Sequence, residues 1–215
     1  MNPIQSTIDQ VLSGKKELII NITDDKNYHI GTLQPITVKH LQCADIIEKL
    51  TEWRNLNMQN FLTQFFATSK RTRNWIKNML SENKGQMLFL IYENEKIIGH
   101  YGFKNLTSDD VLLDNAMRGE RDGDPKLLVY AGRALVKWLF TQAKVNQIRA
   151  EVMTDNIPAI MMNKRIGFGD GSCHPLLRQT EDSDTHWEIG QEGKESPENR
   201  YCFKLILKKI NFSAR

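Results

Sequence analysis

The alternation of strand-forming and helix-forming segments in the second half of the chain is the feature that most constrains its fold. Residues 111–117 (VLLDNAM) and 147–153 (QIRAEVM) are apolar runs typical of strands, and residues 125–139 carry apolar side chains at helical spacing. Residues 156–165 predict a second, shorter helix that ends at Gly167. Because strands separated by a helix pair in parallel through a right-handed crossover, the sequence predicts an α/β fold.

The loop before the longer helix carries clear boundary signals. Residues 118–125 (RGERDGDP) hold two glycines and a proline, which favour a loop. Asp124 is expected to cap the helix, with Pro125 at its first position, where the missing N–H of proline costs nothing.

Other segments predict antiparallel strands and flanking helices. Residues 87–92 and 96–103 form a hairpin across a short polar turn. Further strands are expected over 17–22, 28–33 and 201–210, and further helices over 4–12, 38–53 and 73–80. The acidic segment 179–199 is expected to be mostly loop.

Composition limits the classes of function that fit the chain. Its 215 residues, 40% hydrophobic and 26% charged, are typical of one globular unit. The chain lacks a run of roughly 18 apolar residues and a secretory leader pattern, so a cytoplasmic location without membrane contact is expected. A net charge of +3 is too small to predict nucleic-acid binding. Three cysteines without a CxxC pair and five histidines without ligand spacing predict neither disulfides nor a metal site.

Residues 156–168 (NIPAIMMNKRIGF), read with the strand before them, resemble the GNAT superfamily of acetyl-CoA-dependent N-acetyltransferases. The resemblance covers residues 32–210, which makes residues 1–31 an N-terminal helix and β extension and a candidate homodimer contact. It implies a mixed, mostly antiparallel central sheet with a splayed parallel pair. It also implies acetyl-CoA as co-substrate, no metal, and a primary amine of a small molecule as acceptor.

The resemblance implies a set of cofactor contacts. A strand that diverges from its neighbour leaves backbone groups unpaired, and the extended pantetheine arm can pair with them like an added strand. Asn156 is expected to hold this arm, which is compatible with a role as helix N-cap. Pyrophosphate is expected at the start of the longer helix, where free N–H groups favour anions. The other expected cofactor contacts are Met117, Lys126, Gly132 and Arg133.

The phosphate-binding loop departs from the family's pattern. Leu127 and Tyr130 stand where that pattern has a basic or amide residue and its first glycine. Asp124 close to a pyrophosphate would also repel it.

Candidate catalytic residues come from the central strands and the second helix. If strands 96–103 and 111–117 form a hairpin centred near Thr107, His100 faces Asp114, and the pair could serve as general base, with a raised imidazole pKa. A purely structural contact is the alternative. Asn163 stands where many family members carry a tyrosine that protonates the leaving thiolate. Asparagine can hydrogen-bond the sulfur, with the proton coming from solvent.

The acceptor is predicted from two short stretches. HYGF at 100–103 and DNAMRG at 114–119 resemble segments of enzymes of surface-sugar pathways, which favours an amino sugar, nucleotide-linked. The alternatives are a protein N-terminal or lysine amine, and a non-catalytic acyl-CoA-binding module, which the atypical loop and the missing tyrosine would fit. The acidic residues of 179–199 either attract a cationic amine or belong to a solvated loop.

Overall fold

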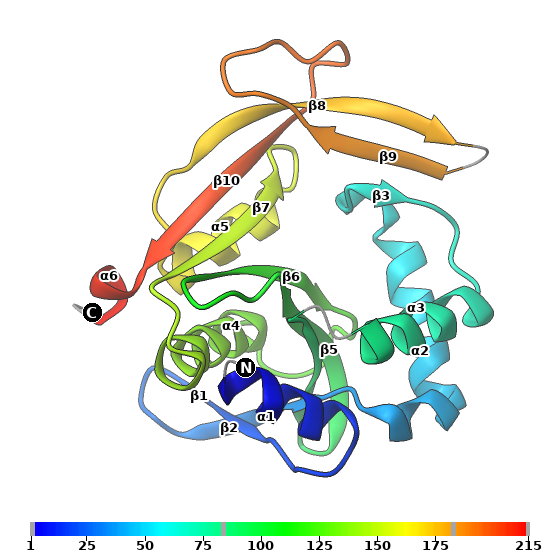
Figure 1. Ribbon diagram of the computed structural model, residues 1–215, viewed down its shortest axis with the longest axis vertical. Helices are drawn as coiled ribbons and strands as arrows, with labels where there is room; N and C mark the ends of the chain where they lie inside the picture. Colours follow the sequence, from blue (N-terminus) through cyan, green and yellow to red (C-terminus); the bar gives the residue numbers. More distant parts are fainter. Residues whose placement is uncertain (1–2, 83–84, 182–183, 214–215) are drawn as a thin grey trace.

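A computed structural model describes residues 3–82, 85–181 and 184–213, and its centre is a twisted sheet (Figure 1). The strand order is β1-β2-β4-β5-β6-β7-β10-β8-β9-β3. The strands are β1 (Ile20–Thr23), β2 (His29–Pro35), β3 (Thr63–Gln64), β4 (Met87–Glu93), β5 (Lys96–Lys104), β6 (Asp110–Arg118), β7 (Gln147–Met153), β8 (Ser172–Glu181), β9 (Asp184–Ile189) and β10 (Tyr201–Lys208).

One strand pair gives the sheet its mixed character. Strands β6 and β7 pair in parallel, and the other pairings among the described residues are antiparallel. Helix α4 (Leu127–Trp138), extended by a π-helical turn over Leu139–Ala143, connects the two parallel strands. The predicted fold class is therefore confirmed, including its parallel pair.

Helices cover both faces of the sheet, because strand β4 is apolar on both sides. Phe89 and Ile91 belong to the core beneath α1 (Pro3–Leu12), α4 and α5 (Ile157–Ile166). Leu88 and Leu90 belong to a second core beneath α2 (Ala44–Leu56) and α3 (Ser69–Glu82). A strand buried on both faces has a continuous apolar run instead of an alternating pattern.

The N-terminal part differs in detail from the prediction. A short 3-10 helix over Val38–Gln42 precedes α2, so the expected helix over 38–53 is broken at Cys43. Apolar side chains of α1, among them Ile8, pack into the same core as α4. Strand β2 crosses the boundary expected between residues 31 and 32.

Segment 179–199 contains more strand than expected. Strand β8 extends to Glu181, β9 pairs with it, and the outer edge of β9 pairs with β3. Residues 182–183 of this segment lie outside the described residues. Both strands are polar along most of their length, and their buried apolar residues include Leu176 and Trp187. A hairpin that buries so little apolar surface does not produce the alternation by which strands are recognised.

Helix α4 begins two residues later than predicted. Its first residue is Leu127 and its N-cap position is Lys126. Asp124 instead closes the preceding turn: its Oδ1 accepts the Lys126 backbone N–H at 2.7 Å, and its carbonyl accepts that of Leu127 at 3.0 Å.

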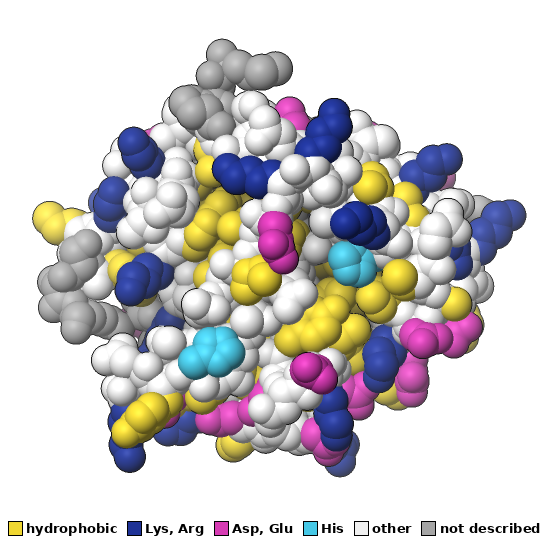
Figure 2. Space-filling model, turned by 90° about the horizontal axis from the view of Figure 1, so that it is seen from below, with side chains coloured by type: hydrophobic (Ala, Val, Ile, Leu, Met, Phe, Trp, Pro, Cys, Tyr) yellow, Lys and Arg dark blue, Asp and Glu magenta, His cyan; other side chains and the backbone are white. Residues whose placement is uncertain are grey.

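The last described element is a short helix, α6 (Lys209–Ser213), which follows β10. Among the described residues, no helix combines the length and the apolar character needed to cross a bilayer. Acidic and basic side chains are interspersed on the face seen in Figure 2, with hydrophobic side chains gathered between them.

Candidate active site

The parallel strands β6 and β7 separate part of the way along their length. Their pairing runs from Asp110 opposite Gln147 to Leu113 opposite Ala150 and ends there, although β6 continues to Arg118 and β7 to Met153. Beyond this point the two strands no longer pair with each other, so the backbone N–H and C=O groups on their facing edges can bind an extended ligand. The predicted splay of the parallel pair is therefore present.

A β-bulge distorts β6 where the splay begins. His100 lies opposite Met117 and Gly102 opposite Asp114, so Tyr101 faces the two residues 115–116. Asn115 has a φ of 51°, in the left-handed region. A bulge of this kind breaks the ladder and reorients the strand, and here it aims residues of β6 into the gap between the strands.

His100 is hydrogen-bonded to the bulge. Its Nδ1 lies 2.7 Å from the carbonyl oxygen of Asn115, which can only accept, so Nδ1 carries the hydrogen and Nε2 is the free acceptor. The imidazole is 4% exposed and stacks on Trp53 with ring centres 6.1 Å apart. Burial lowers the pKa of His100 to about 4, against a smaller upward effect of the hydrogen bond.

The predicted pairing of His100 with Asp114 is wrong, because the turn between β5 and β6 is centred one residue later than Thr107. Asp114 lies opposite Gly102, and its carboxylate is 3.3 Å from the Lys104 ammonium and accepts a hydrogen bond from the Asn115 side chain. Without a carboxylate partner in the dry interior, the imidazole loses basicity instead of gaining it. The raised pKa expected for His100 is therefore also wrong.

The low pKa of His100 predicts a loss of stability in acid. The unfolded chain binds a proton at His100 near pH 6.5, whereas the folded protein resists it down to about pH 4. The stabilisation from neutral His100 is complete above pH 6.5 and is lost as the pH falls towards 4, by about 3 kcal/mol. Urea unfolding between pH 7 and 4.5 should show a shallower fall for His100→Asn than for the wild type. Equal slopes would contradict this assignment.

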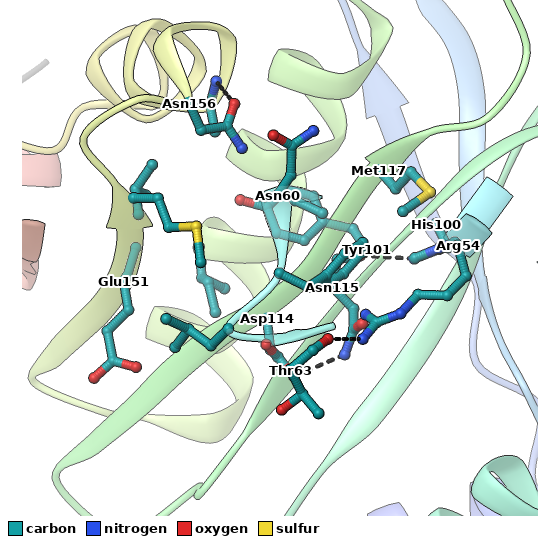
Figure 3. A pocket seen from close by; sticks show the side chains of 18 of the residues that line it. Arg54, Asn60, Thr63, His100, Tyr101, Asp114, Asn115, Met117, Glu151 and Asn156 are labelled. Atoms are coloured by element: carbon teal, nitrogen blue, oxygen red, sulfur yellow. Dashed lines mark hydrogen bonds between the residues drawn. The ribbon is translucent and has the colours of Figure 1, made fainter. Parts of the chain in front are cut away.

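A cavity of about 450 Å³ opens between the splayed strands and is closed by parts of α2, α3, α5 and the 57–66 connection. Figure 3 shows side chains from both strands and from the connection pointing toward this space. Among the polar groups that line it are Arg54, Lys104, Asp114, Glu151 and Asn163. Carboxylates thus come from both diverging strands, which suits the binding of an amine and the acceptance of its proton.

Two asparagines of α5 border the cavity. Asn156 caps the helix, its Oδ1 accepting the Ala159 backbone N–H at 3.2 Å. Asn163 is 3% exposed, and its Nδ2 donates to the Ala159 carbonyl at 2.9 Å. The Oδ1 of Asn163 is buried without a hydrogen-bond partner. Since this unsatisfied atom is an acceptor, it suits a ligand N–H, and a hydrogen bond to a thioester sulfur would have to use the second Nδ2 hydrogen.

The loop between β6 and α4 is fastened by side chains of the protein. Arg118 donates to backbone carbonyls of the loop, among them that of Asp124 at 2.7 Å. The Glu93 carboxylate accepts the Asp124 backbone N–H at 3.0 Å, and Asp124 itself accepts that of Lys126. Two N–H groups that could have faced a phosphate are therefore bonded to carboxylates. The side chain of Lys126 remains a candidate phosphate contact at this end of α4.

Gly132 and Arg133 lie away from the start of α4. A Cβ at Gly132 would come within 2.4 Å of the Ile166 side chain, so this glycine lets α4 pack closely against α5. Arg133 bonds to the Asp25 carboxylate at 2.6 Å and to the Arg165 carbonyl at 2.9 Å. Gly132 therefore has a packing role and Arg133 an ion-pairing one, and the geometry gives no support to their predicted phosphate contacts. Met117 lines the cavity.

Sequence reasoning missed the wall of the cavity formed by α2, α3 and the connection between them. The missed residues are Arg54, Phe61, Thr63, Phe65 and Arg71. The aromatic run FLTQFF at 61–66 was a usable signal, because three phenylalanines outside a helix or strand pattern favour a binding surface over a loop. No sequence pattern indicated that Arg54 lines a cavity, since a single arginine in an amphipathic helix is typical of a solvated face.

Among the described residues, three or more His, Cys, Asp or Glu side chains nowhere gather into a group that could hold a metal ion. A parallel pair that separates next to a partly polar cavity is an arrangement that can accommodate an extended ligand.

Comparison with known proteins agrees with this interpretation. Residues 39–170 match the family described as Acetyltransferase (GNAT) domain, and the chain belongs to this family. Acetyltransferase PseH of Campylobacter jejuni is 24% identical over 123 residues, which are 57% of this chain and 76% of PseH.

Two solved structures share the fold. Spermidine N-acetyltransferase from Vibrio cholerae, solved with CoA and spermine, has a TM-score of 0.60 and 12% identity, with 85% of this chain and 98% of that chain covered. FdhC, a nucleotide-linked sugar GNAT, has a TM-score of 0.60 and 15% identity, with 92% and 94% covered.

Proposed function

We propose that the protein transfers the acetyl group of acetyl-CoA to the primary amine of a small molecule, an amino sugar carried on a nucleotide. The observation that carries the proposal is the splay of β6 and β7 with a bulge at its origin. Membership of the GNAT family supports acetyl transfer. The likeness to FdhC, a nucleotide-linked sugar GNAT, agrees with the acceptor, together with the HYGF and DNAMRG stretches.

The residues at the splay fit the pantetheine arm of acetyl-CoA. The separated edges of β6 and β7 offer backbone groups to its two amides, and the buried Oδ1 of Asn163 lacks a donor that such an amide N–H could supply. When bound, acetyl-CoA supplies the acetyl group as an activated thioester. Asn156, Asn163 and Met117 would hold its arm, and Lys126 would lie toward its phosphates.

The chain's own residues then have separate tasks. The bulge at Asn115 presents β6 backbone to the reacting carbonyl, and His100 keeps the bulge in shape through its bond to the Asn115 oxygen. Asp114 accepts the proton of the incoming amine, directly or through a water, so that the amine attacks in its neutral form. His100 is thus a positioning residue in this proposal.

Calorimetric titration with acetyl-CoA and CoA, followed by assays of thiol release, tests the function. The acceptor panel should contain free and nucleotide-linked amino sugars, polyamines, and peptides with a free N-terminus or lysine. Thiol release with a nucleotide-linked amino sugar is the expected result. Release only with peptides or polyamines would overturn the acceptor, and binding without any release would favour an acyl-CoA-binding module.

Replacing Asn163 by leucine should separate ligand binding from stability. Leucine has nearly the shape of asparagine and removes the unsatisfied acceptor, so the free energy of unfolding of the free protein should stay level or rise by about 1 kcal/mol. Acetyl-CoA binding should weaken by about tenfold, since a hydrogen bond to the ligand is lost. Thermal unfolding and calorimetry of the same variant measure both. Unchanged affinity would contradict the role of Asn163.

A further inference from the structure

Two arginines and two phenylalanines form a stack on the cavity wall opposite the splayed strands. The Arg54 guanidinium carbon lies 3.6 Å from the ring centre of Phe61 and 4.8 Å from that of Phe65, and the Arg71 carbon lies 3.6 Å from the Phe65 ring. Rings and guanidinium groups therefore alternate, and all four side chains line the cavity. Stacking on rings fixes the plane of each guanidinium group and leaves its edges free to donate.

The Arg54 side chain is half-buried and lacks an ion-pair partner among the described residues. Its guanidinium donates to the Thr63 carbonyl at 2.5 Å (Figure 3), and its Nε is buried without a hydrogen-bond partner. Burial, opposed by the charge of Asp114 and assisted by that of Arg71, lowers the pKa of Arg54 to about 10, so the group stays charged at neutral pH. Within the described part of the chain, no carboxylate lies within ion-pair distance of Arg54. The two carboxylates on this side of the cavity pair with other cations, Asp114 with Lys104 and Asp184 with Arg71. A cation without an ion-pair partner beside a cavity favours the binding of an anionic ligand.

Charged side chains line two sides of the cavity, and Lys104 lies beside Asp114 on one of them. Asp114 and Glu151 lie on the diverging strands, where the amine is acetylated, and Arg54 and Arg71 lie on the opposite wall. A ligand that matches this pattern carries its amine at one end and negative charge at the other. Trp75, 40% exposed, adds a flat ring on the same helix as Arg71. Planar guanidinium edges favour the oxygens of a phosphoryl group, and the neighbouring rings favour a base attached to it.

We propose that Arg54 and Arg71, held in their stack by Phe61 and Phe65, form an anion subsite that binds the phosphoryl groups of the acceptor. The inference rests on the proposed function and deepens it, because it assigns the recognition of a nucleotide carrier to named residues. Arg71 is oriented by Asp184 of β9, at 2.5 Å, and Arg54 by the backbone of β3. The pairing of β3 with β9 thereby fixes the distance between the two charges.

Binding of nucleoside diphosphates tests the subsite without any turnover. The probes are UDP, CDP and GDP, the matching nucleosides, and inorganic pyrophosphate. Each is titrated calorimetrically in saturating CoA, so that the phosphate contacts of the donor are occupied. At least one diphosphate should bind about ten- to a hundredfold tighter than its nucleoside, because hydrogen bonds to charged groups add that much. Higher salt should weaken this binding.

Variants of the two arginines supply the control. Arg71→Gln and Arg54→Gln should each weaken diphosphate binding by about tenfold or more and leave nucleoside binding nearly unchanged. The diphosphate affinity of Arg54→Lys should lie between that of the glutamine variants and that of the wild type, because lysine keeps the charge and loses the planar guanidinium group. Lys70→Gln removes one charge from the exposed side of α3, outside the cavity, and should change nothing.

Two results would overturn the subsite. One is diphosphate binding no tighter than nucleoside binding. The other is a set of variants that unfold more easily but bind normally, which would make the stack a purely structural clamp. If acetyl-CoA binds and thiol release occurs under either result, the inference fails and the transferase function stands. If acetyl-CoA does not bind, the proposed function fails irrespective of the diphosphate titrations.

Discussion

Replacing His100 by leucine should lower kcat by about a hundredfold while acetyl-CoA still binds, since small displacements of a positioning element have effects of this size. Leucine fills much of the imidazole volume and cannot donate to the Asn115 carbonyl, so the bulge loses the bond that fixes it. The buried carbonyl is then left without this donor, which also lowers the free energy of unfolding by about 1–3 kcal/mol.

His100→Asn is the matched variant. The Nδ2 of asparagine can take the place of Nδ1 as donor to Asn115, so this variant should recover most of the kcat lost in leucine. Neither variant should change how kcat depends on pH between 6 and 8, because His100 is neutral throughout that range. The positioning role is wrong if the asparagine variant is as inactive as the leucine variant. It is also wrong if the wild-type pH profile of kcat shows a titration near pH 6.5 that is missing from both variants, because His100 would then act as a base.

Replacing Trp53 by alanine should lower the free energy of unfolding by about 3–5 kcal/mol, the usual cost of removing a large buried aromatic side chain. Trp53 is 3% exposed and belongs to the core beneath α2 and α3. It also supports two parts of the site: the His100 ring stacks on it, and a Cβ at Gly119 would lie 2.0 Å from its ring. The cavity left by alanine therefore opens below both the bulge and the loop before α4.

Urea unfolding at pH 7 measures this cost, and Trp75→Ala is its control. Trp75 is 40% exposed, so the same chemical change there should cost less than about 1 kcal/mol. The Trp53 variant should in addition bind acetyl-CoA more weakly, since its loop is no longer supported. A loss of stability similar in both variants would show that Trp53 does not anchor the second core.

The crossover unit was predictable from sequence because each of its signals is local. Asn156 and Gly167 mark the two ends of α5, and the structure places both ends there. The spacing of apolar residues likewise gave α4, although its first residue is Leu127 and not Pro125. The splay of β6 and β7 followed from the family resemblance and not from the strands, since a gap between strands has no residue pattern of its own.

The register of β5 and β6 could not be predicted, and the pairing of His100 with Asp114 failed for this reason. The turn is centred one residue later than Thr107, which places Asp114 opposite Gly102, and the extra residue at Asn115 then moves each later pair by one further position. Bulges depend on tertiary contacts, here the Nδ1 of a buried histidine. The Arg54 stack was out of reach for a related reason, because its members become neighbours only when α2, α3 and β9 are assembled.

Pairing of β3 with β9 has a consequence for the order of events during synthesis. The contact of Thr63 with His186 joins positions 123 residues apart, and Trp187 bonds to Leu62 beside it. The two-residue strand β3 is too short to be stable alone, so we expect its segment to become ordered only after β9, whose His186 is synthesised 123 residues after Thr63. We expect nascent chains stalled before β9 to protect the β4–β5 hairpin against proteolysis while leaving the 57–66 connection open to cleavage.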